Sequence, residues 1–141
     1  MAVETATITQ TEHIPAKPQA IYDVLTNAES HAAFSKAKAT GNAKVGETFE
    51  FWDGQIKGKH LELQPGKKIR QEWMVAMPGA WPEGHPPSIV EFTLVEKGDG
   101  TDVTMVHSGL PAPGLEHFKQ GWNERYWKPM KDYFVKKKQA G

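Results

Sequence analysis

Histidine and serine are the first side chains to consider as a base, a nucleophile or a metal ligand. The sequence has no cysteine, which rules out thiolate metal sites and a cysteine nucleophile. His60, His107 and His117 are expected on or near the space between a curved sheet and a long helix. A zinc site needs three or four converging ligands, and no two histidines have a short ligand spacing. His107 is next to Ser108, but neighbouring strand residues point to opposite faces of a sheet. The sequence therefore predicts no catalytic residue, no metal site and no cofactor.

The remaining histidines and one arginine are interpreted as structural. His13, His31 and His85 are expected to be exposed or to bond within local turns. Arg70 lies near acidic residues of adjacent predicted strands, and ion pairing on the solvent face accounts for it. The alternative places Arg70 inside a cavity, where it would hold a ligand carboxylate.

A set of large side chains is more informative about function. On the predicted fold they converge between the sheet and the helix: Phe49, Phe51, Trp73, Phe92, Met105, His107, Trp122, Tyr126 and Met130. Two interpretations stay open. These residues fill an ordinary core, or they line a cavity for a small apolar or amphipathic ligand that the Tyr126 hydroxyl or His107 orients.

A long helix is needed to carry the last of these residues. Large apolar residues recur at steps of three and four along one stripe: Leu115, Phe118, Trp122, Tyr126, Met130 and Tyr133. Trp127 and Phe134 widen that stripe. Residues 113–138 are therefore predicted to form one amphipathic helix, which Pro129 kinks because it lacks a backbone N–H.

The rest of the chain predicts a concave partner for this helix. We expect a first strand at residues 3–14 and two short helices beginning at Pro18 and Asn27. Further strands are expected at residues 49–51, 55–63, 68–75, 88–96 and 101–108. Asp53-Gly54 predicts a tight two-residue hairpin turn, and Gly58 marks a bulge or a close approach of the helix. The fold class is α+β, with a curved antiparallel sheet of about six or seven strands around the C-terminal helix.

The composition limits the partners. The chain has 141 residues, and its 17 basic and 17 acidic side chains cancel. Without a net positive charge, nothing favours nucleic acid. No apolar run approaches the ~18 residues of a membrane span, and the N-terminus lacks the features of a secretory signal. We expect one domain, residues 1–141, in a cytoplasmic protein without membrane insertion.

A proline-rich loop over residues 77–87 is the candidate contact surface for a protein partner. It is predicted to be rigid, and it carries Trp81 and His85. Trp81 either forms part of an exposed contact patch or folds back over one end of the sheet.

Three stretches carry a family resemblance: GETFEFWDGQIKGKHLELQPGKKIRQEW, WPEGHPPSIVEFTL and GLPAPGLEHFKQGWNERYWKPMKDYF. They resemble the C-terminal domain of activators of the 90-kilodalton heat-shock protein ATPase, over about residues 14–134. The resemblance implies a helix-grip fold of the START-like (SRPBCC) and birch-pollen-allergen-like superfamily, whose cavity often holds an apolar ligand. Eukaryotic activators also carry a separate N-terminal domain that makes the main chaperone contact. This chain has no segment resembling the asparagine- and tryptophan-rich motif of that domain.

Three functions are therefore weighed. The first is a non-enzymatic carrier or sensor that binds a small apolar ligand between the sheet and the helix. The second is a protein-interaction module, a co-chaperone-like relative of the activator domain. The third is a cyclase- or hydrolase-type enzyme, which would need a polar pair inside the cavity. The fold alone does not decide among them, because one scaffold hosts many functions.

Overall fold

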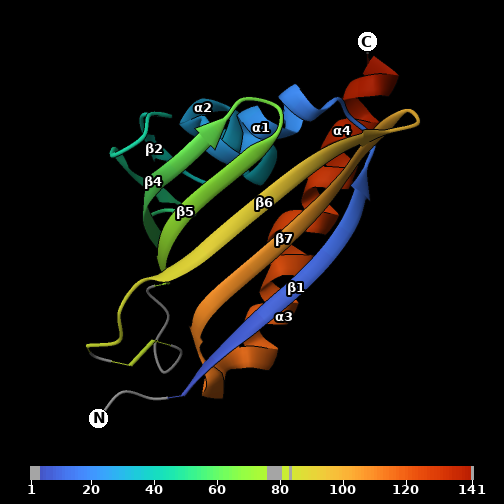
Figure 1. Cartoon of the computed structure of the whole chain (residues 1–141). Coiled ribbons are helices and arrows are strands. Elements are labelled where there is room, and N and C mark those ends of the chain that lie inside the picture. Colours follow the sequence, from blue (N-terminus) through green and yellow to red (C-terminus); the bar gives the residue numbers. More distant parts are fainter. Residues whose placement is uncertain (1–3, 76–80, 83, 141) are drawn as a thin grey trace.

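The residues that the computed structural model describes, 4–75, 81–82 and 84–140, form a seven-stranded antiparallel sheet around a long C-terminal helix (Figure 1). The strands are β1 (Thr5–Ile14), β2 (Thr40–Gly41), β3 (Thr48–Phe51), β4 (Ile56–Gln64), β5 (Lys68–Val75), β6 (Ser88–Lys97) and β7 (Gly100–Pro111). Their order across the sheet is β1-β7-β6-β5-β4-β3-β2. This is the predicted helix-grip architecture.

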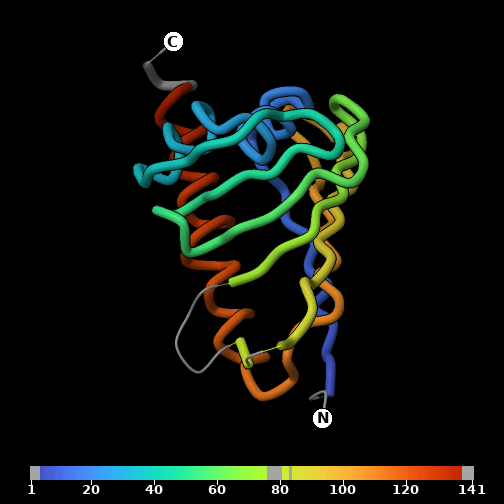
Figure 2. Tube along the Cα trace, turned by 90° about the vertical axis from the view of Figure 1, so that its left-hand side faces the viewer, coloured from blue at the N-terminus to red at the C-terminus, as the bar shows by residue number. Residues whose placement is uncertain are grey.

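Two short helices follow β1, as predicted: α1 (Pro18–Thr26) and α2 (Ala28–Ser35). Pro18 occupies the start of α1, where a missing N–H costs nothing. The Asn27 side chain caps α2 by accepting from the Ser30 N–H at 3.0 Å. Figure 2 shows both helices at one end of the molecule, while the C-terminal helix runs along the inner side of the curved sheet.

The C-terminal helix is irregular in the middle. It comprises a 3-10 turn (Ala112–Gly114), α3 (Leu115–Trp122), a π turn (Asn123–Trp127) and α4 (Lys128–Ala140). The Lys128 N–H bonds to the Asn123 carbonyl, five residues back, and Pro129 has no N–H to offer. The π turn thus ends two residues before Pro129. The kink predicted at Pro129 itself stays a prediction. Within the described ranges, no helix has both the length and the apolar character that crossing a membrane requires.

Two hairpin connections differ in length, and the two-residue turn predicted at Asp53-Gly54 is wrong. Lys97 pairs with Gly100, so a two-residue turn joins β6 and β7. Phe51 pairs with Ile56, however, so residues 52–55 form the connection that was predicted to be the two residues Asp53-Gly54. Asp53 is tied elsewhere: its carboxylate accepts from the Lys38 N–H, and its own N–H donates to the Lys38 carbonyl. These bonds hold the loop against the segment before β2.

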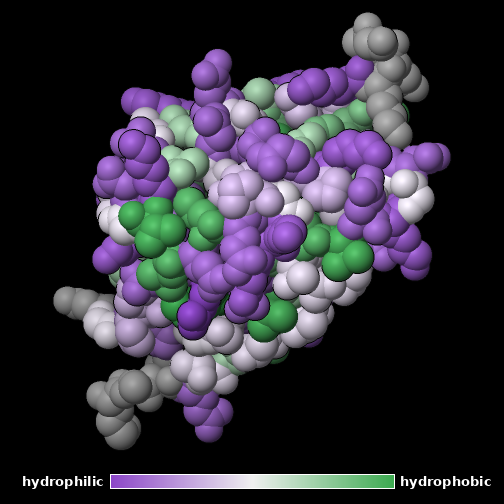
Figure 3. All heavy atoms as spheres, turned by 45° about the horizontal axis from the view of Figure 1, so that its top comes forward, coloured by the Kyte–Doolittle hydropathy of each residue, from purple (hydrophilic) through white to green (hydrophobic). Residues whose placement is uncertain are grey.

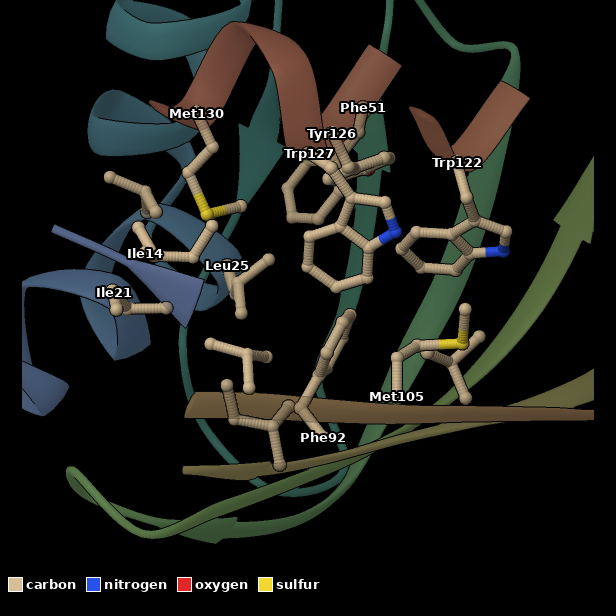
Figure 4. Close-up of a cluster of buried hydrophobic side chains, with 14 of the residues drawn as sticks. Ile14, Ile21, Leu25, Phe51, Phe92, Met105, Trp122, Tyr126, Trp127 and Met130 are labelled. Atoms are coloured by element: carbon tan, nitrogen blue, oxygen red, sulfur yellow. The ribbon is translucent and has the colours of Figure 1, made fainter. Parts of the chain in front are cut away.

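Aromatic rings fill much of the space between the sheet and the helix (Figure 4). Trp73 of β5 stacks on Trp122 of α3 with ring centroids 5.0 Å apart, and Trp122 stacks on Trp127 at 5.7 Å. The predicted stripe is buried at its centre, and Trp127 and Phe134 are buried beside it. The end of the molecule that carries α1 and α2 shows mainly polar side chains, with apolar groups in separate patches (Figure 3).

Candidate functional site

A cleft of about 130 Å³ lies between the C-terminal helix and the β4–β5 part of the sheet. Its lining comes from both layers: Ile56, Trp73, Val75, His107, His117, Phe118, Gln120, Gly121, Trp122, Glu124, Arg125 and Tyr126. The buried members form an aromatic floor, and His117, Gln120 and Glu124 are exposed at the rim. The cleft is therefore an apolar hollow with a polar border.

The nine residues predicted to line a cavity are all buried, but the structure divides them. Four line the cleft: Trp73, His107, Trp122 and Tyr126. The other five pack within the core away from it: Phe49, Phe51, Phe92, Met105 and Met130. Most of the set therefore belongs to the core, and one end of it borders a hollow. Binding of a ligand by these residues stays a prediction.

His107 is held by hydrogen bonds on both ring nitrogens. The Trp122 indole N–H donates to Nδ1 at 3.1 Å, and Nε2 lies 2.7 Å from the Ser88 hydroxyl. An indole nitrogen can only donate, so Nδ1 carries no proton, and the neutral ring must carry its hydrogen on Nε2. Nε2 therefore donates to Ser88, whose hydroxyl in turn donates to the Trp73 carbonyl at 2.9 Å.

This direction of donation determines what the pair can do chemically. A general base must accept the proton of its nucleophile, whereas His107 donates to Ser88. Burial lowers the pKa of His107 to about 3, so the ring stays neutral. Both residues are at most 1% exposed. The Ser88–His107 pair thus links two neighbouring strands, β6 and β7, and orients His107 toward the Trp122 indole of the helix. It is not arranged as a nucleophile and its base.

Sequence reasoning compared His107 with Ser108 and missed Ser88. The register of the β6–β7 hairpin could have identified it, because Lys97 opposite Gly100 places Val90 opposite His107. Ser88 is then the diagonal neighbour of His107 on the same face of the sheet. The missing signal was the hairpin register, which the Gly98-Asp99 turn already implied.

A second buried polar contact involves Tyr126. Its hydroxyl lies 2.9 Å from Nε2 of His31, and the His31 ring stacks on Phe51 with centroids 3.8 Å apart. Burial lowers the pKa of His31 to about 3 and raises the pKa of Tyr126 well above its ordinary value. The expectation that His31 is exposed is wrong: it is fully buried, because α2 turns His31 and Phe34 inward together.

The three histidines predicted near the cavity lie in different environments. His107 is in the cleft floor and His117 is exposed at its rim. His60 is buried against Phe49 outside the cleft, and burial lowers its pKa to about 4. Gln71 lies 3.4 Å from His60 and also accepts from the Trp73 indole at 2.8 Å. Across the described part of the chain, no three histidine, aspartate or glutamate side chains come together as metal ligands would.

Two backbone features mark the helix side of the cleft. Gly121 lies inside α3, and a Cβ placed there would meet no atom within 4 Å. A helix-interior glycine costs ~1 kcal/mol relative to alanine, and close packing does not explain this one. The π turn begins two residues later, at Asn123. π turns are rare overall, and those that occur are often found at functional sites. Both departures from regular helix therefore occur where the helix borders the cleft.

Arg125 connects the π turn to the loop between β3 and β4. Its guanidinium lies 5.4 Å from the Trp52 ring centroid and donates to the Gln55 side chain at 2.5 Å. Trp52 and Asp53 have φ values of 54° and 58°, which non-glycine residues seldom adopt. Arg125 thus holds a strained loop at one border of the cleft.

Trp81 and His85 lie in the described part of the proline-rich loop; residues 76–80 and 83 lie outside the described residues. Trp81 is half-buried, packs edge-on against Phe118 at 6.1 Å and donates to the His85 carbonyl at 3.2 Å. His85 is buried, and its Nε2 donates to the Gly109 carbonyl at 2.9 Å. His85 is therefore not exposed, and the other alternative, a bond within a local turn, is confirmed, since its backbone N–H donates to the Pro82 carbonyl at 3.0 Å. A protein-contact role for the loop stays a prediction.

Arg70 is exposed on β5, so the solvent-face interpretation holds and the cavity interpretation is wrong. The ion pairs there belong to Lys68, which lies 3.8 Å from Glu62 and 3.4 Å from Glu91. Exposed pairs of this kind contribute little stability.

These features define a helix-grip protein with a small cleft on its C-terminal helix. A family model described as "Activator of Hsp90 ATPase homolog 1-like protein" matches residues 15–135. The chain belongs to this family.

The chain is 35% identical over 132 residues to the human "Activator of 90 kDa heat shock protein ATPase homolog 1", covering 94% of this chain and 38% of that protein. A homologue of the activator from Dictyostelium discoideum is 28% identical, covering 92% and 33%. The chain thus spans about a third of the length of these relatives, 38% of the first and 33% of the second.

Solved structures agree on the fold. A crystal structure of an HSP90 activator from Plasmodium falciparum superposes with a TM-score of 0.75 at 25% identity, covering 85% of this chain and 89% of that chain. A protein from Mesorhizobium loti has a TM-score of 0.77 at 21% identity, covering 93% and 98%, and shows the fold alone.

Proposed function

We propose that this chain is a non-enzymatic binding domain that contacts a partner protein through the cleft beside Gly121, and that the partner is a 90-kilodalton heat-shock chaperone. The cleft takes one apolar side chain of that partner. The observation that carries the proposal is the cleft itself. It lies beside a π turn and beside Gly121, where an added Cβ would meet no atom within 4 Å. The chaperone is suggested by the names of the relatives, which match nearly the whole chain.

The size of the cleft supports a side chain over a lipid. Its volume is about 130 Å³, whereas sites for drug-sized ligands have ~300–1,000 Å³. An engineered apolar cavity of ~150 Å³ binds benzene. The cleft therefore has room for one aromatic or branched aliphatic group and too little for a fatty acid.

The cleft also has the arrangement of an anchor site. Trp73, Trp122 and Tyr126 form a rigid apolar floor, and Glu124 with Gln120 supplies polar groups at the rim. Interfaces bind mainly through a few apolar anchors in fitted pockets, surrounded by polar contacts. Gly121 keeps the entrance free of a side chain.

A non-enzymatic role is supported by the buried polar groups. His107 donates to Ser88 and its pKa is lowered to about 3, so it is a poor general base. Tyr126 has its pKa raised by burial, so its hydroxyl stays neutral. The relatives are named as activators of an ATPase.

The test is titration calorimetry of the purified chaperone into this protein, together with ATP turnover by the chaperone in its presence and absence. Saturable binding supports the proposal, whether or not turnover changes. A Kd in the micromolar range would be evident at protein concentrations up to ~100 μM. If no heat of binding is measured and no complex is recovered by pull-down at those concentrations, the chaperone is not the partner.

A small apolar or amphipathic ligand is the second candidate, because the same cleft accommodates a free molecule of benzene size. Native mass spectrometry of the purified protein and a titration with toluene, followed by NMR of the Trp122 indole N–H, test it. Binding of toluene without binding of the chaperone would favour this candidate. Displacement of a fluorescent fatty acid from the protein would show that the protein holds a lipid. That result would contradict the argument from the cleft volume, on which both candidates rest.

A further inference from the structure

A second hollow of the structure is an open groove between the end of α2 and α4. Its volume is about 840 Å³, several times that of the cleft. Four exposed lysines line it, Lys36, Lys128, Lys136 and Lys137, together with the exposed carboxylates of Glu124 and Asp132. Among the described lining residues, only Glu124 borders both hollows. The groove is therefore a separate surface, and what binds there does not depend on the function proposed for the cleft.

The groove lysines are available to bind an external anion. Among the side chains that the structure describes, none of the four lies at ion-pair distance from a carboxylate, whereas Lys131 on the same helix pairs with Glu12. Four lysines against two carboxylates give the groove a net charge of +2, although the 17 basic and 17 acidic residues of the whole chain cancel. Positive charge is thus concentrated at the groove, and the rest of the chain is net negative.

Apolar groups form the floor between these charges. Phe34 is buried, and Pro129 and Tyr133 are half-buried. Nζ of Lys137 lies 5.5 Å from the Tyr133 ring centroid. The two walls are fixed to each other, because Phe34 packs on Tyr126 with ring centroids 5.8 Å apart. A preformed groove of this kind loses little conformational freedom when a ligand binds.

The surroundings of the groove favour separated carboxylates over phosphates. Phosphates typically bind at helix N-termini, where free N–H groups point outward. This groove is instead lined by the C-terminal end of α2, where the partial charge is negative. Glu124 and Asp132 also lie among the lysines, so a chain with a charge on every unit, such as a nucleic acid, meets repulsion there. A peptide with separated carboxylates avoids both positions and can place an apolar side chain on the floor.

We propose that this groove binds an acidic segment of another protein, in which an apolar side chain lies between carboxylates. The apolar side chain packs on Pro129 and Tyr133, and the carboxylates pair with the surrounding lysines. Exposed ion pairs are individually weak and are screened by salt. The complex is therefore expected to have a Kd in the micromolar range or weaker, and to lose affinity as the salt concentration rises.

The test is fluorescence anisotropy of a labelled peptide with a central leucine and glutamates on both sides. The protein is titrated into it at ~0.1 M salt, where charges more than ~10 Å apart are largely screened. Saturable binding is expected for the wild type. Reversing two groove charges together, with Lys128→Glu and Lys136→Glu, should weaken binding at least about tenfold, because each change removes an attraction and adds a repulsion.

The matched control reverses two lysines outside the groove, with Lys57→Glu and Lys59→Glu. Both are exposed on β4, so the change in net charge is the same and binding should stay near that of the wild type. Equal losses from the two double variants would show attraction by net charge alone and would overturn the proposal. An absence of saturable binding at protein concentrations up to ~1 mM would overturn it too.

Two changes of probe test the chemistry of the ligand. Serine in place of the central leucine should weaken binding at least about fivefold, because the apolar contact with the floor is lost. Equal binding of the two peptides would contradict a role for the floor. A single-stranded oligothymidine should not displace the peptide, and displacement would assign the groove to nucleic acid and overturn the proposal.

Backbone NMR of the wild type locates the bound peptide without any variant. Shift changes are expected at Lys36 and over residues 128–137. Changes confined to residues 117–121 would place the peptide in the cleft and would contradict the assignment to the groove. No chaperone is present in these experiments, so a negative result here is distinct from a failure of the chaperone to bind.

Discussion

The indole N–H of Trp122 donates to Nδ1 of His107 over 3.1 Å, between the C-terminal helix and the centre of the sheet. This bond fixes the tautomer of the histidine and orients the tryptophan that forms the cleft floor. One contact thus couples the attachment of the helix to the shape of the candidate binding site.

Trp122→Phe should destabilise the protein more than Trp127→Phe does. Both changes remove an indole N–H and similar volume, but the first leaves a fully buried His107 nitrogen unpaired, at a cost of ~1–3 kcal/mol. Trp127 donates to Gln10, which is only half-buried and can recruit water. Urea unfolding of the two variants measures the difference in free energy of unfolding, and equal losses would contradict the tautomer argument.

Stability should fall steeply as the pH drops below about 6.5, the ordinary pKa of histidine. Burial lowers the pKa to about 3 for His31, to about 4 for His60 and to about 3 for His107. Below pH 6.5 the unfolded chain therefore binds more protons than the folded chain. Each of these histidines then lowers the free energy of unfolding by up to ~1.4 kcal/mol per pH unit. The full contribution is present above pH 6.5 and is lost progressively as the pH falls toward the folded-state pKa, about 4 for His60 and about 3 for His31 and His107.

The measurement is urea unfolding at pH 7.5, 6.5 and 5.5. His60→Gln removes one of the three titrating groups, and the slope of stability against pH should decrease by about a third. His117→Gln, at an exposed position, is the control and should leave the slope unchanged. A wild type equally stable at pH 7.5 and 5.5 would show that these histidines are not buried and neutral as the structure has them.

Two glycine-to-alanine changes should have opposite signs. A Cβ at Gly121 meets no atom within 4 Å, so Gly121→Ala should stabilise the helix by up to ~1 kcal/mol. A Cβ at Gly58 would lie 2.3 Å from both the Glu72 carbonyl oxygen and the Phe49 ring, so Gly58→Ala should destabilise strongly. Thermal unfolding of both variants checks this, and destabilisation by Gly121→Ala would indicate a packing role for that glycine.

The fold could be predicted because its signals are local or periodic. Apolar spacing along residues 113–138 identified the buried helix face, and β5 begins and ends where period two begins and ends in the sequence. Gly58 was identified as a close approach, although the neighbours are Phe49 and the β5 backbone in place of the helix. The loop after Phe51 was misjudged because a contact distant in sequence, with Lys38, overrides its turn preference.

The site was harder to predict, because its geometry depends on contacts between distant elements. The burial of His31 follows from the docking of α2 on β3 and the C-terminal helix, which no local pattern of α2 indicates. The π turn depends on how the helix accommodates Pro129 over the aromatic floor. The aromatic set was identified correctly as buried, but which of its members border a hollow depends on packing between layers.

The central claim, that the cleft beside Gly121 takes an apolar side chain of the chaperone, is tested most directly by titrating the chaperone into two leucine variants. Gly121→Leu fills the cleft, and Lys119→Leu places the same side chain on α3 outside it. The proposal predicts at least about tenfold weaker binding for Gly121→Leu and near wild-type binding for Lys119→Leu, with both variants folded by circular dichroism. Wild-type affinity of Gly121→Leu would contradict the claim even if the chaperone binds.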